Sequence, residues 1–273
     1  MERIGIIGVG LLGSAIATRL QGAGYSVLGF DLVPERRIGT ASADEVVREC
    51  ATVLFCLPTS DVVAEVLGGL RVPKGRVLID CTTGEPEAMA RMGADQAKAG
   101  VDYLDATVLG SSAVVRKGGA VVMAGGRREV FDGVAPLFRT FAARSFYLGG
   151  YGSGARMKLV ANLALGLNRA VLAEALGFAQ HYGISPTDAL EVLKAGAAYS
   201  RVMDDKGEKM LHHDFNVEAK LSQHLKDVRL ILAAAAAHGG KVPLSQVHRE
   251  LLERLEAAGY GEMDNSAIVM AYE

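Results

Sequence analysis

The chain has 273 residues, of which 50% are hydrophobic and 22% are charged, a composition typical of a globular protein with a sizeable core. It carries 29 Lys and Arg against 31 Asp and Glu, and its net charge of −2, without basic runs, excludes the charge pattern of a nucleic-acid or anionic-membrane binder. We therefore expect a small-molecule partner, and neither a nucleic-acid nor a membrane partner.

The N-terminus and the cysteines indicate the compartment. The first residues, MERIGIIGVG, place charges ahead of a short apolar run, so they predict no signal peptide, and no apolar run is expected to span a membrane. The chain has three cysteines, an odd number without metal-ligand spacing: Cys50, Cys56 and Cys81. This pattern favours reduced thiols and no metal site. We expect a cytoplasmic protein.

A strand, a glycine turn and a helix open the chain. Apolar residues 3–7 predict the strand, and apolar residues from 15 to 20 predict the helix. Between them stands a G-x-G-x-x-G turn made of Gly8, Gly10 and Gly13. Glycines let the backbone approach a pyrophosphate, and the start of a helix stabilises its negative charge. This context predicts a dinucleotide-binding site.

Asp31 directly follows a second predicted strand at residues 25–30. A carboxylate there accepts hydrogen bonds from the adenosine ribose and repels the 2′-phosphate of NADP, so NAD is the expected cofactor. Arg36 and Arg37 keep NADP possible, because an arginine just past this strand is what a 2′-phosphate needs. The other interpretation is that both arginines begin a helix and face water.

Predicted strands and helices alternate up to about residue 148. The further strands are expected at residues 52–57, 77–79, 101–106, 120–124 and 145–148, with helices at 61–67 and 86–99. This alternation is typical of a parallel, doubly wound sheet, in which ligands bind beyond the carboxyl ends of the strands. The segments expected at those ends are residues 57–59, 80–83 and 105–112.

The second half of the chain predicts helices alone. From Ser153 to Tyr182 the helical pattern is roughly 45 Å long at 1.5 Å per residue and is expected to bridge two domains. Gly183 ends it, and Ser185 and Pro186 fit the N-cap and first turn of the next helix. The predicted fold is α/β, with a Rossmann-type doubly wound domain at residues 1–152 and an all-α substrate and oligomerisation domain at residues 153–273.

The start of that long helix, GSGARMKLVAN at residues 152–162, carries a polar stripe. Lys158, Asn162, Leu165 and Arg169 repeat at helical spacing on one face. One explanation is a lysine that snorkels out of a buried helix. The dinucleotide domain just before it favours the other explanation, a catalytic lysine and amide.

Five blocks follow one another along the chain: GVGLLG with Asp31, CLP at residues 56–58, DCTTGEP at 80–86, DATVLGSS at 105–112 followed by MAGG at 123–126, and GSGARMKLVAN. Lys226-Asp227 and DNSA at residues 264–267 add to them. In this order the blocks resemble the β-hydroxyacid dehydrogenase family, of the 3-hydroxyisobutyrate dehydrogenase type, over essentially the whole length.

The resemblance implies roles at matching positions. Lys158 matches the catalytic lysine, which gives a proton to the substrate carbonyl during reduction, and Asn162 matches the amide that orients the substrate. It implies cofactor contacts for Gly8, Gly10, Leu11, Leu12, Gly13, Asp31, Leu57, Pro58, Thr83 and Lys226, and substrate contacts for Leu109, Gly110, Ser111 and Asn162. Burial and a position in the first helical turn would both lower the pKa of a lysine, as a general acid needs.

The chain departs from the family where the substrate carboxylate is held. The family sequence D-A-P-V-S-G-G is D-A-T-V-L-G-S here, so Thr107 replaces proline, Leu109 replaces serine and Ser111 replaces the second glycine. Leu109 removes one hydroxyl, while Ser111 and Ser112 supply others nearby. The pocket is expected to differ in shape, so the resemblance does not carry 3-hydroxyisobutyrate itself over as the substrate. Ala161 replaces the first of the paired asparagines after the lysine.

Three functions remain open at this point. The favoured one is an NAD-dependent dehydrogenase of a small β-hydroxy acid, or a reductase of its semialdehyde, with Lys158 as general acid–base. The alternatives are an NADPH-linked reductase of a short semialdehyde bearing a different acid group, and a dinucleotide-binding protein without catalysis. The helical half and the family resemblance favour a homodimer or homotetramer.

Overall fold

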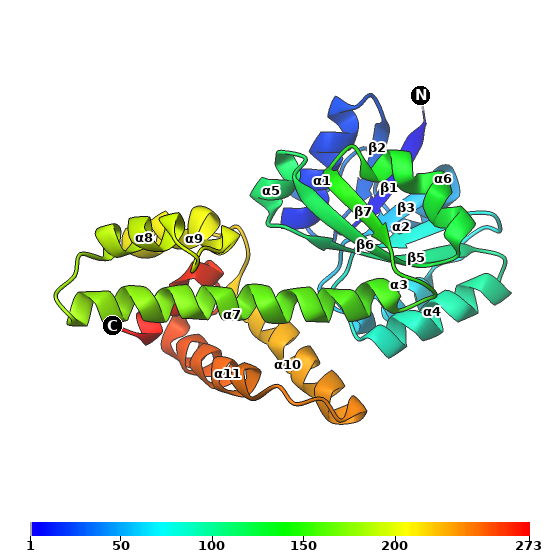
Figure 1. The fold of residues 1–273 in the computed structure, drawn as a ribbon. Coiled ribbons are helices and arrows are strands. Elements are labelled where there is room, and N and C mark those ends of the chain that lie inside the picture. Colours follow the sequence, from blue (N-terminus) through cyan, green and yellow to red (C-terminus); the bar gives the residue numbers. More distant parts are fainter. Residues whose placement is uncertain (1) are drawn as a thin grey trace. The chain divides into compact units, whose positions relative to one another are not determined.

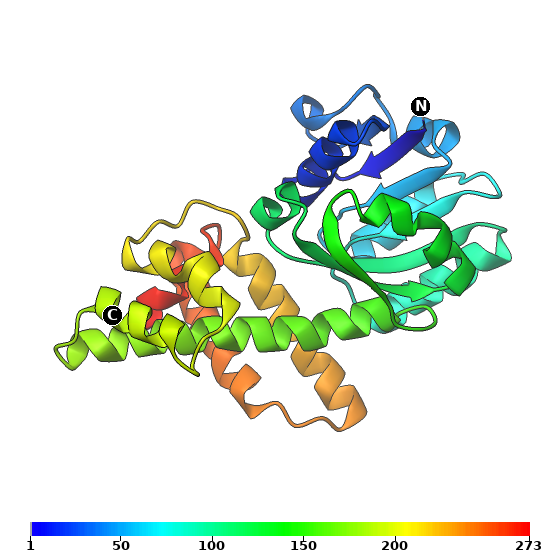
Figure 2. The ribbon, with the colours of Figure 1, turned by 45° about the horizontal axis from the view of Figure 1, so that its top comes forward.

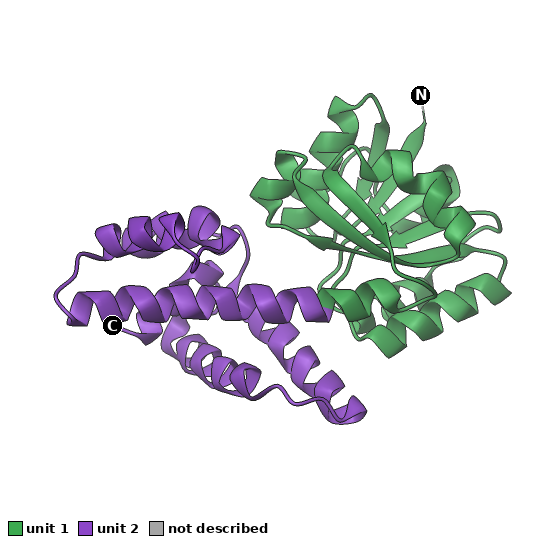
Figure 3. Cartoon of the chain, in the orientation of Figure 1, with its two compact units in different colours: residues 1–158 green, residues 159–273 purple. Residues whose placement is uncertain are grey.

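The computed structural model describes residues 2–273, which fold into two compact units (Figure 3). Unit 1 extends to Lys158 and unit 2 comprises residues 159–273. The division falls inside one long helix, between Lys158 and Leu159.

Unit 1 contains a seven-stranded sheet in the order β2-β1-β3-β4-β5-β6-β7 (Figure 1). Its strands are β1 (Arg3–Ile7), β2 (Ser26–Phe30), β3 (Thr52–Phe55), β4 (Val77–Asp80), β5 (Asp102–Leu109), β6 (Ala120–Gly126) and β7 (Ala142–Tyr147). The first five strands are parallel, whereas β6 pairs antiparallel with β5 and parallel with β7. The predicted doubly wound sheet is confirmed, with its last two strands reversed.

Helices cover both faces of this sheet (Figures 1 and 2). On one face lie α1 (Leu11–Gly22), α5 (Ser112–Arg116) and α6 (Arg128–Phe138), and on the other lie α2 (Ala43–Glu49), α3 (Ser60–Gly69) and α4 (Pro86–Lys98). Alternate residues of β1 point to opposite faces: Ile4 and Ile6 join the first core and Ile7 the second. A sheet covered on both faces needs apolar residues on both, which explains the continuous apolar runs in the sequence.

Helices α5 and α6 lie where no helix was predicted, and α2 begins at Ala43, six residues after the arginines that one interpretation placed at the start of a helix. Two of them, α2 and α5, have only seven and five residues, so a helical hydrophobic period has no room to show. Ser42 and Ser111 begin them as N-caps, and each side-chain oxygen accepts a backbone N–H in the first turn.

Strand β5 runs to Leu109, beyond the predicted end at residue 106. Asp105 and Thr107 therefore lie inside the strand with 0% exposure, and the expectation that they belong to a loop past its carboxyl end was wrong. The reason is the antiparallel partner β6, which pairs with β5 from Leu104↔Gly126 to Leu109↔Val121. The backbone hydrogen bonds to β6 hold Asp105 and Thr107 in a strand, which their residue types alone do not predict.

Unit 2 is all helical, as predicted. It comprises most of α7 (Ser153–His181), together with α8 (Pro186–Ala195), α9 (Arg201–Leu211), α10 (Leu221–His238), α11 (Pro243–Leu255), a π-helical turn at Glu256–Tyr260 and a 3-10 helix at Asn265–Ala271. The 29 residues of α7 confirm the predicted long helix. Ser185 caps α8 ahead of Pro186, also as predicted.

Helix α7 is the one helix among residues 2–273 that is long and apolar enough to cross a membrane, contrary to the expectation that no apolar run would reach that length. This is weak support for a membrane span, because the core helix of a globular protein has the same length and composition. Leu172, Ala173 and Leu176 of α7 are buried in the core of unit 2.

Candidate active site

The glycine turn connects β1 to α1 in unit 1. A Cβ on Gly13 would lie 2.0 Å from the Gly8 carbonyl oxygen, so only glycine permits this close approach. A Cβ on Gly10 would meet nothing within 4 Å, so the space beside the turn is open. Helix α1 begins at Leu11 with no side-chain cap and no acidic residue in its first turn. Its first backbone N–H groups are therefore suited to an anion, which fits the pyrophosphate of a dinucleotide.

Asp31 lies beside this turn. Its Oδ2 accepts the Val9 N–H at 2.8 Å, and its Oδ1 accepts the Val33 N–H at 2.9 Å. The carboxylate thus links the end of β2 to the glycine turn. Arg37 folds back onto the same loop, where its Nε donates to the Asp31 carbonyl oxygen at 2.8 Å. Arg36 is exposed and ends the short 3-10 helix Pro34–Arg36.

The predicted cofactor residues Leu57 and Thr83 follow β3 and β4. The Leu57 N–H donates to Thr82 Oγ1 at 3.1 Å, and the Thr82 N–H donates to Asp80 Oδ1 at 2.9 Å. The Tyr103 hydroxyl donates to Asp80 Oδ2 at 2.7 Å, and burial raises the pKa of Asp80 to about 6. Asp80 and Thr82 therefore fix the two strand ends together. Neither residue is among the predicted site residues, although an acid at the end of an apolar strand is a usable signal.

The three predicted substrate residues of unit 1 form the connection from β5 to α5. Leu109 is the last residue of β5, and Gly110 has φ of +138°, a conformation that favours glycine. Ser111 accepts the Val114 N–H through its hydroxyl oxygen at 3.4 Å. A hydroxyl that accepts in this way can still donate its own proton. The Ser111 hydroxyl therefore still has a proton to donate next to Gly110.

Lys158 is the sixth residue of α7 and is buried, with 8% exposure. Its Nζ donates to the carbonyl oxygen of Val108 in β5 at 2.7 Å. The lysine therefore lies in the second helical turn, and the expectation of a first-turn position was wrong. The helix dipole acts mainly within the first turn, so the lysine lies beyond its strongest part.

Asn162 lies one turn further along α7, in unit 2, and is 4% exposed. Its Nδ2 donates to Asp227 Oδ2 on α10 at 2.8 Å. Lys226 lies next to this pair, with its Nζ 3.1 Å from Asp227 Oδ1. Asp227 thus fixes the orientation of the Asn162 amide, a role that the sequence analysis did not assign. Lys226 is the one predicted cofactor residue that belongs to unit 2.

Arg169 continues the stripe and is 3% exposed, with Nε and Nη1 lacking a hydrogen-bond partner. Burial lowers its pKa to about 10, while Asp264 and Asp227 act in the opposite direction. Lys158, Asn162 and Arg169 are all buried, so the snorkelling explanation of the stripe does not hold.

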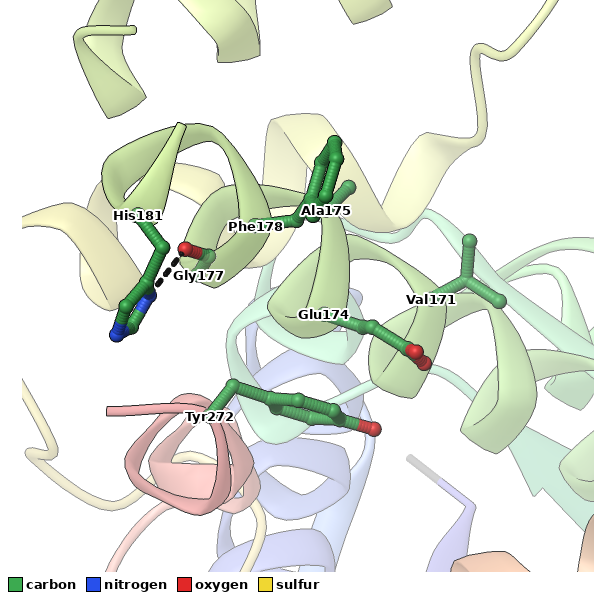
Figure 4. A pocket seen from close by; sticks show the side chains of 7 residues that line it. All are labelled: Val171, Glu174, Ala175, Gly177, Phe178, His181 and Tyr272. Atoms are coloured by element: carbon green, nitrogen blue, oxygen red, sulfur yellow. Dashed lines mark hydrogen bonds between the residues drawn. The ribbon is translucent and has the colours of Figure 1, made fainter. Parts of the chain in front are cut away.

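A pocket of about 510 Å³ lies elsewhere, on the last turns of α7 (Figure 4). It is lined by Val171, Glu174, Ala175, Gly177, Phe178, His181 and Tyr272, and contains none of the predicted site residues.

Among residues 2–273, no group of three or more His, Cys, Asp or Glu side chains could hold a metal ion. Cys50, Cys56 and Cys81 are free cysteines.

Comparison with known protein families shows to which family the chain belongs. Residues 3–149 match the family described as the NAD binding domain of 6-phosphogluconate dehydrogenase, and residues 152–272 match the one described as NAD-binding of NADP-dependent 3-hydroxyisobutyrate dehydrogenase. The chain belongs to the β-hydroxyacid dehydrogenase family. It is therefore an NAD(P)-dependent oxidoreductase, and the alternative of a dinucleotide-binding protein without catalysis is set aside.

Individual relatives cover the whole chain. The 2-hydroxy-3-oxopropionate reductase of Escherichia coli K12 is 30% identical, over 99% of this chain and 97% of its own. The 2-(hydroxymethyl)glutarate dehydrogenase of Eubacterium barkeri is 29% identical, over 99% and 95%. The crystal structure of a 3-hydroxyisobutyrate dehydrogenase from Salmonella typhimurium shares the fold, with a TM-score of 0.90 over 99% of both chains at 24% identity.

Proposed function

We propose that this β-hydroxyacid dehydrogenase interconverts a small β-hydroxy acid and its semialdehyde, with NAD as cofactor and Lys158 as general acid–base. The cofactor supplies or accepts the hydride. The observation that carries the proposal is the buried Lys158 ammonium, which the Val108 carbonyl oxygen holds at 2.7 Å. When a carbonyl carbon receives a hydride, its oxygen becomes basic, and an ammonium can donate the proton it needs. In the reverse direction the neutral amine accepts the hydroxyl proton.

We assign the remaining residues around this step. Asn162 orients the substrate, and Asp227 holds the Nδ2 side of its amide at 2.8 Å. The glycine turn, Asp31 and the residues following β3 and β4 bind the dinucleotide, with Lys226 at the nicotinamide end. The segment Leu109–Ser111 binds the substrate carboxylate through backbone N–H groups and the Ser111 hydroxyl. Residues 1–152 are then the dinucleotide domain, and residues 153–273 the substrate and oligomerisation domain.

The relatives narrow the substrate class to be tested first. Their names describe short hydroxy acids and one oxo acid, so the panel begins with 2-hydroxy-3-oxopropionate, 2-(hydroxymethyl)glutarate and 3-hydroxyisobutyrate. The altered segment from Thr107 to Ser111 supports a substrate other than 3-hydroxyisobutyrate. If neither these acids nor any other hydroxy acid of three to six carbons is turned over, the assigned substrate class is refuted.

Replacing the lysine tests the assigned chemistry. Lys158→Ala is expected to lower kcat by at least about 10³-fold, because proton transfer and positioning are both lost, while the Kd for NADH stays within twofold. Lys98→Ala is the matched control, since Lys98 is an exposed lysine of unit 1 paired with Asp95. Turnover retained in the Lys158→Ala variant would refute the role of this lysine.

The preference for NAD rests on Asp31, whose carboxylate lies at the glycine turn. The exposed Arg36 favours the alternative, an NADPH-linked semialdehyde reductase. The ratio of kcat/KM for NADH to that for NADPH separates the two. We expect a ratio above about 10, which Asp31→Ser lowers by removing a negative charge near the 2′ position. A wild-type preference for NADPH would refute the interpretation of Asp31.

Assembly and location complete the proposal. We place the protein in the cytoplasm as a homodimer or homotetramer, without nucleic-acid or membrane partners. Val171 and Phe178 on α7 are 62% and 67% exposed. Tyr182, directly after the helix, is 73% exposed, and its ring stacks on that of Phe178. Exposed apolar side chains beside the pocket of Figure 4 support a helix-mediated interface. Light scattering on the wild type and on Phe178→Glu tests it, and a monomeric wild type would refute it.

A further inference from the structure

We infer that Asp105 is a positioning residue for Lys158, because its buried carboxylate holds the start of α7 against β5 inside unit 1. The inference rests on the proposed role of Lys158 and adds a residue to which that proposal gives no part. It also explains why an acid occupies the middle of a strand in the core.

The carboxylate of Asp105 is 0% exposed, and burying a charge is costly unless hydrogen bonds compensate it. Both oxygens have such bonds. Oδ1 accepts the Gly152 N–H at 2.8 Å, and Oδ2 accepts the Ala155 N–H at 2.9 Å. These N–H groups belong to the N-cap and third positions of α7, where a helix lacks its own acceptors. Since Gly152 has no side chain, a strand residue distant in sequence caps the helix.

The first turn of α7 also lies very close to the sheet. A Cβ on Gly154 would lie 2.4 Å from the carbonyl oxygens of Asp105 and Met123, so glycine at this position lets the first turn lie directly on β5 and β6. The Thr107 hydroxyl adds a bond, donating to the Gly154 carbonyl oxygen at 3.1 Å. Two neighbouring inward residues of β5, Asp105 and Thr107, therefore bind the same helical turn.

Lys158 follows Ala155 by three residues, less than one turn. Its Nζ donates to Val108, which is three residues after Asp105 on the same strand. The helix is thus attached to β5 at two points, and the first of them determines where the lysine side chain starts. A displacement of about 1 Å in a catalytic group can cost roughly 10²-fold in rate. Both carboxylate oxygens of Asp105 bond to backbone N–H groups at the start of α7, so it acts through the position of Lys158.

The charge on Asp105 suits this role. Burial raises its pKa to about 6, the bonds from Ala155 and Gly152 act in the opposite direction, and nearby Asp80 raises it further. At neutral pH the carboxylate faces the positive end of the α7 dipole. An asparagine has one acceptor oxygen where the carboxylate has two, so it directs an NH₂ group at one of the two N–H donors. Asp105→Asn is therefore a small change in size with a large expected effect on the cap.

The experiment compares Asp105→Asn with Asp102→Asn in the whole protein. Asp102 is the matched control because it lies on the same strand but pairs with the exposed Arg127. With 2-hydroxy-3-oxopropionate and NADH, kcat is expected to fall about 10²-fold in Asp105→Asn and less than twofold in Asp102→Asn. The Kd for NADH stays within twofold in both. The apparent pKa in the pH profile of kcat shifts in Asp105→Asn alone.

A second readout needs no substrate. Reductive methylation with ¹³C-formaldehyde labels lysines, and the signal of Lys158 is identified by its loss in Lys158→Ala. Its chemical shift is expected to move in Asp105→Asn and to stay in place in Asp102→Asn. An unmoved signal would contradict the inference even if kcat falls.

A double variant separates this inference from the proposed function. If Asp105 acts through Lys158, adding Asp105→Asn to Lys158→Ala leaves the residual rate unchanged within twofold. A further multiplicative loss, or a normal kcat with only a lower Tm in Asp105→Asn, overturns the inference while Lys158 keeps its role. Turnover retained in Lys158→Ala overturns the proposed function itself.

A second substitution covers the case in which Asp105→Asn does not fold. Thr107→Val keeps the shape of the side chain and removes the hydroxyl, which lies 3.1 Å from the Gly154 carbonyl oxygen and 3.4 Å from that of Met123. It is expected to lower kcat about threefold to tenfold without changing the Kd for NADH, because it loosens the same helical turn less than Asp105→Asn does. An unchanged kcat in this variant would overturn the inference.

Discussion

The glycine turn after β1 and the carboxyl half of β5 are built in opposite ways. The turn depends on missing side chains, since a Cβ on Gly13 would lie 2.0 Å from a carbonyl oxygen. The β5 region depends on buried side chains, since Asp105 and Lys158 bond to backbone groups 47 to 50 residues away. Steric change should therefore damage the turn, and change of charge or of hydrogen bonding should damage the β5 region.

The largest expected effect is in the turn. Gly13→Ala forces a Cβ into the Gly8 carbonyl, so we expect a loss of about 2 to 4 kcal/mol in the free energy of unfolding and no measurable NADH binding. Gly10→Ala meets no atom within 4 Å, so stability should stay within about 0.5 kcal/mol while the Kd for NADH rises at least about tenfold. Urea denaturation and fluorescence titration measure both.

Gly22→Ala is the control for these two variants, because Gly22 ends α1 and a Cβ there also meets nothing within 4 Å. It should raise the free energy of unfolding by at most about 1 kcal/mol and leave NADH binding unchanged. Unchanged NADH binding in Gly10→Ala would mean that the pyrophosphate does not lie in the open space beside the turn.

The next effect concerns the buried carboxyls and depends on pH. The pKa of Asp80 is about 6 in the folded protein against an ordinary value of 3.8, so the folded state binds more protons between these values. The free energy of unfolding therefore falls as pH rises from 4 to 7, by up to about 3 kcal/mol for this group. Asp80→Asn should remove that part of the slope in urea denaturation at several pH values.

The difference between variant and wild type is the quantity to compare, since other groups titrate in the same range. Burial raises the pKa of Asp105 to about 6, which adds a slope of the same sign. Burial lowers the pKa of His248 to about 4. Its contribution to the free energy of unfolding therefore falls as pH drops below its unfolded pKa, so the slope from His248 has the opposite sign. A slope unchanged by Asp80→Asn would show that this carboxyl is ionised over the whole range.

The smallest effect is expected at the substrate segment. Ser111→Ala removes the N-cap of α5 and should cost about 1 kcal/mol, and the KM for the acid substrate should rise about threefold to tenfold with the loss of a hydroxyl donor. Ser42→Ala is the matched control, because Ser42 caps α2 in the same way and lies outside the proposed site. Equal KM values in the two variants would remove Ser111 from the substrate site.

Local physical rules made much of this protein predictable from its sequence. Strand β1, the glycine turn and the start of α1 follow from an apolar run and from the conformations that glycine allows. Helix α7 and the cap of α8 by Ser185 follow from the 3.6-residue period and from side-chain acceptors for orphan N–H groups. Each signal lies within a few residues of the structure it determines.

Only the tertiary structure decided the rest, because the deciding contacts join residues far apart in the chain. Strand β5 extends to Leu109 because β6 pairs with it, and Asn162 is oriented by Asp227, 65 residues away. The partners of Asp105 are the first N–H groups of a helix that begins almost fifty residues later. The sequence contains these residues, but no periodicity or capping rule relates them, so the fold alone places the carboxylate against the helix that carries Lys158.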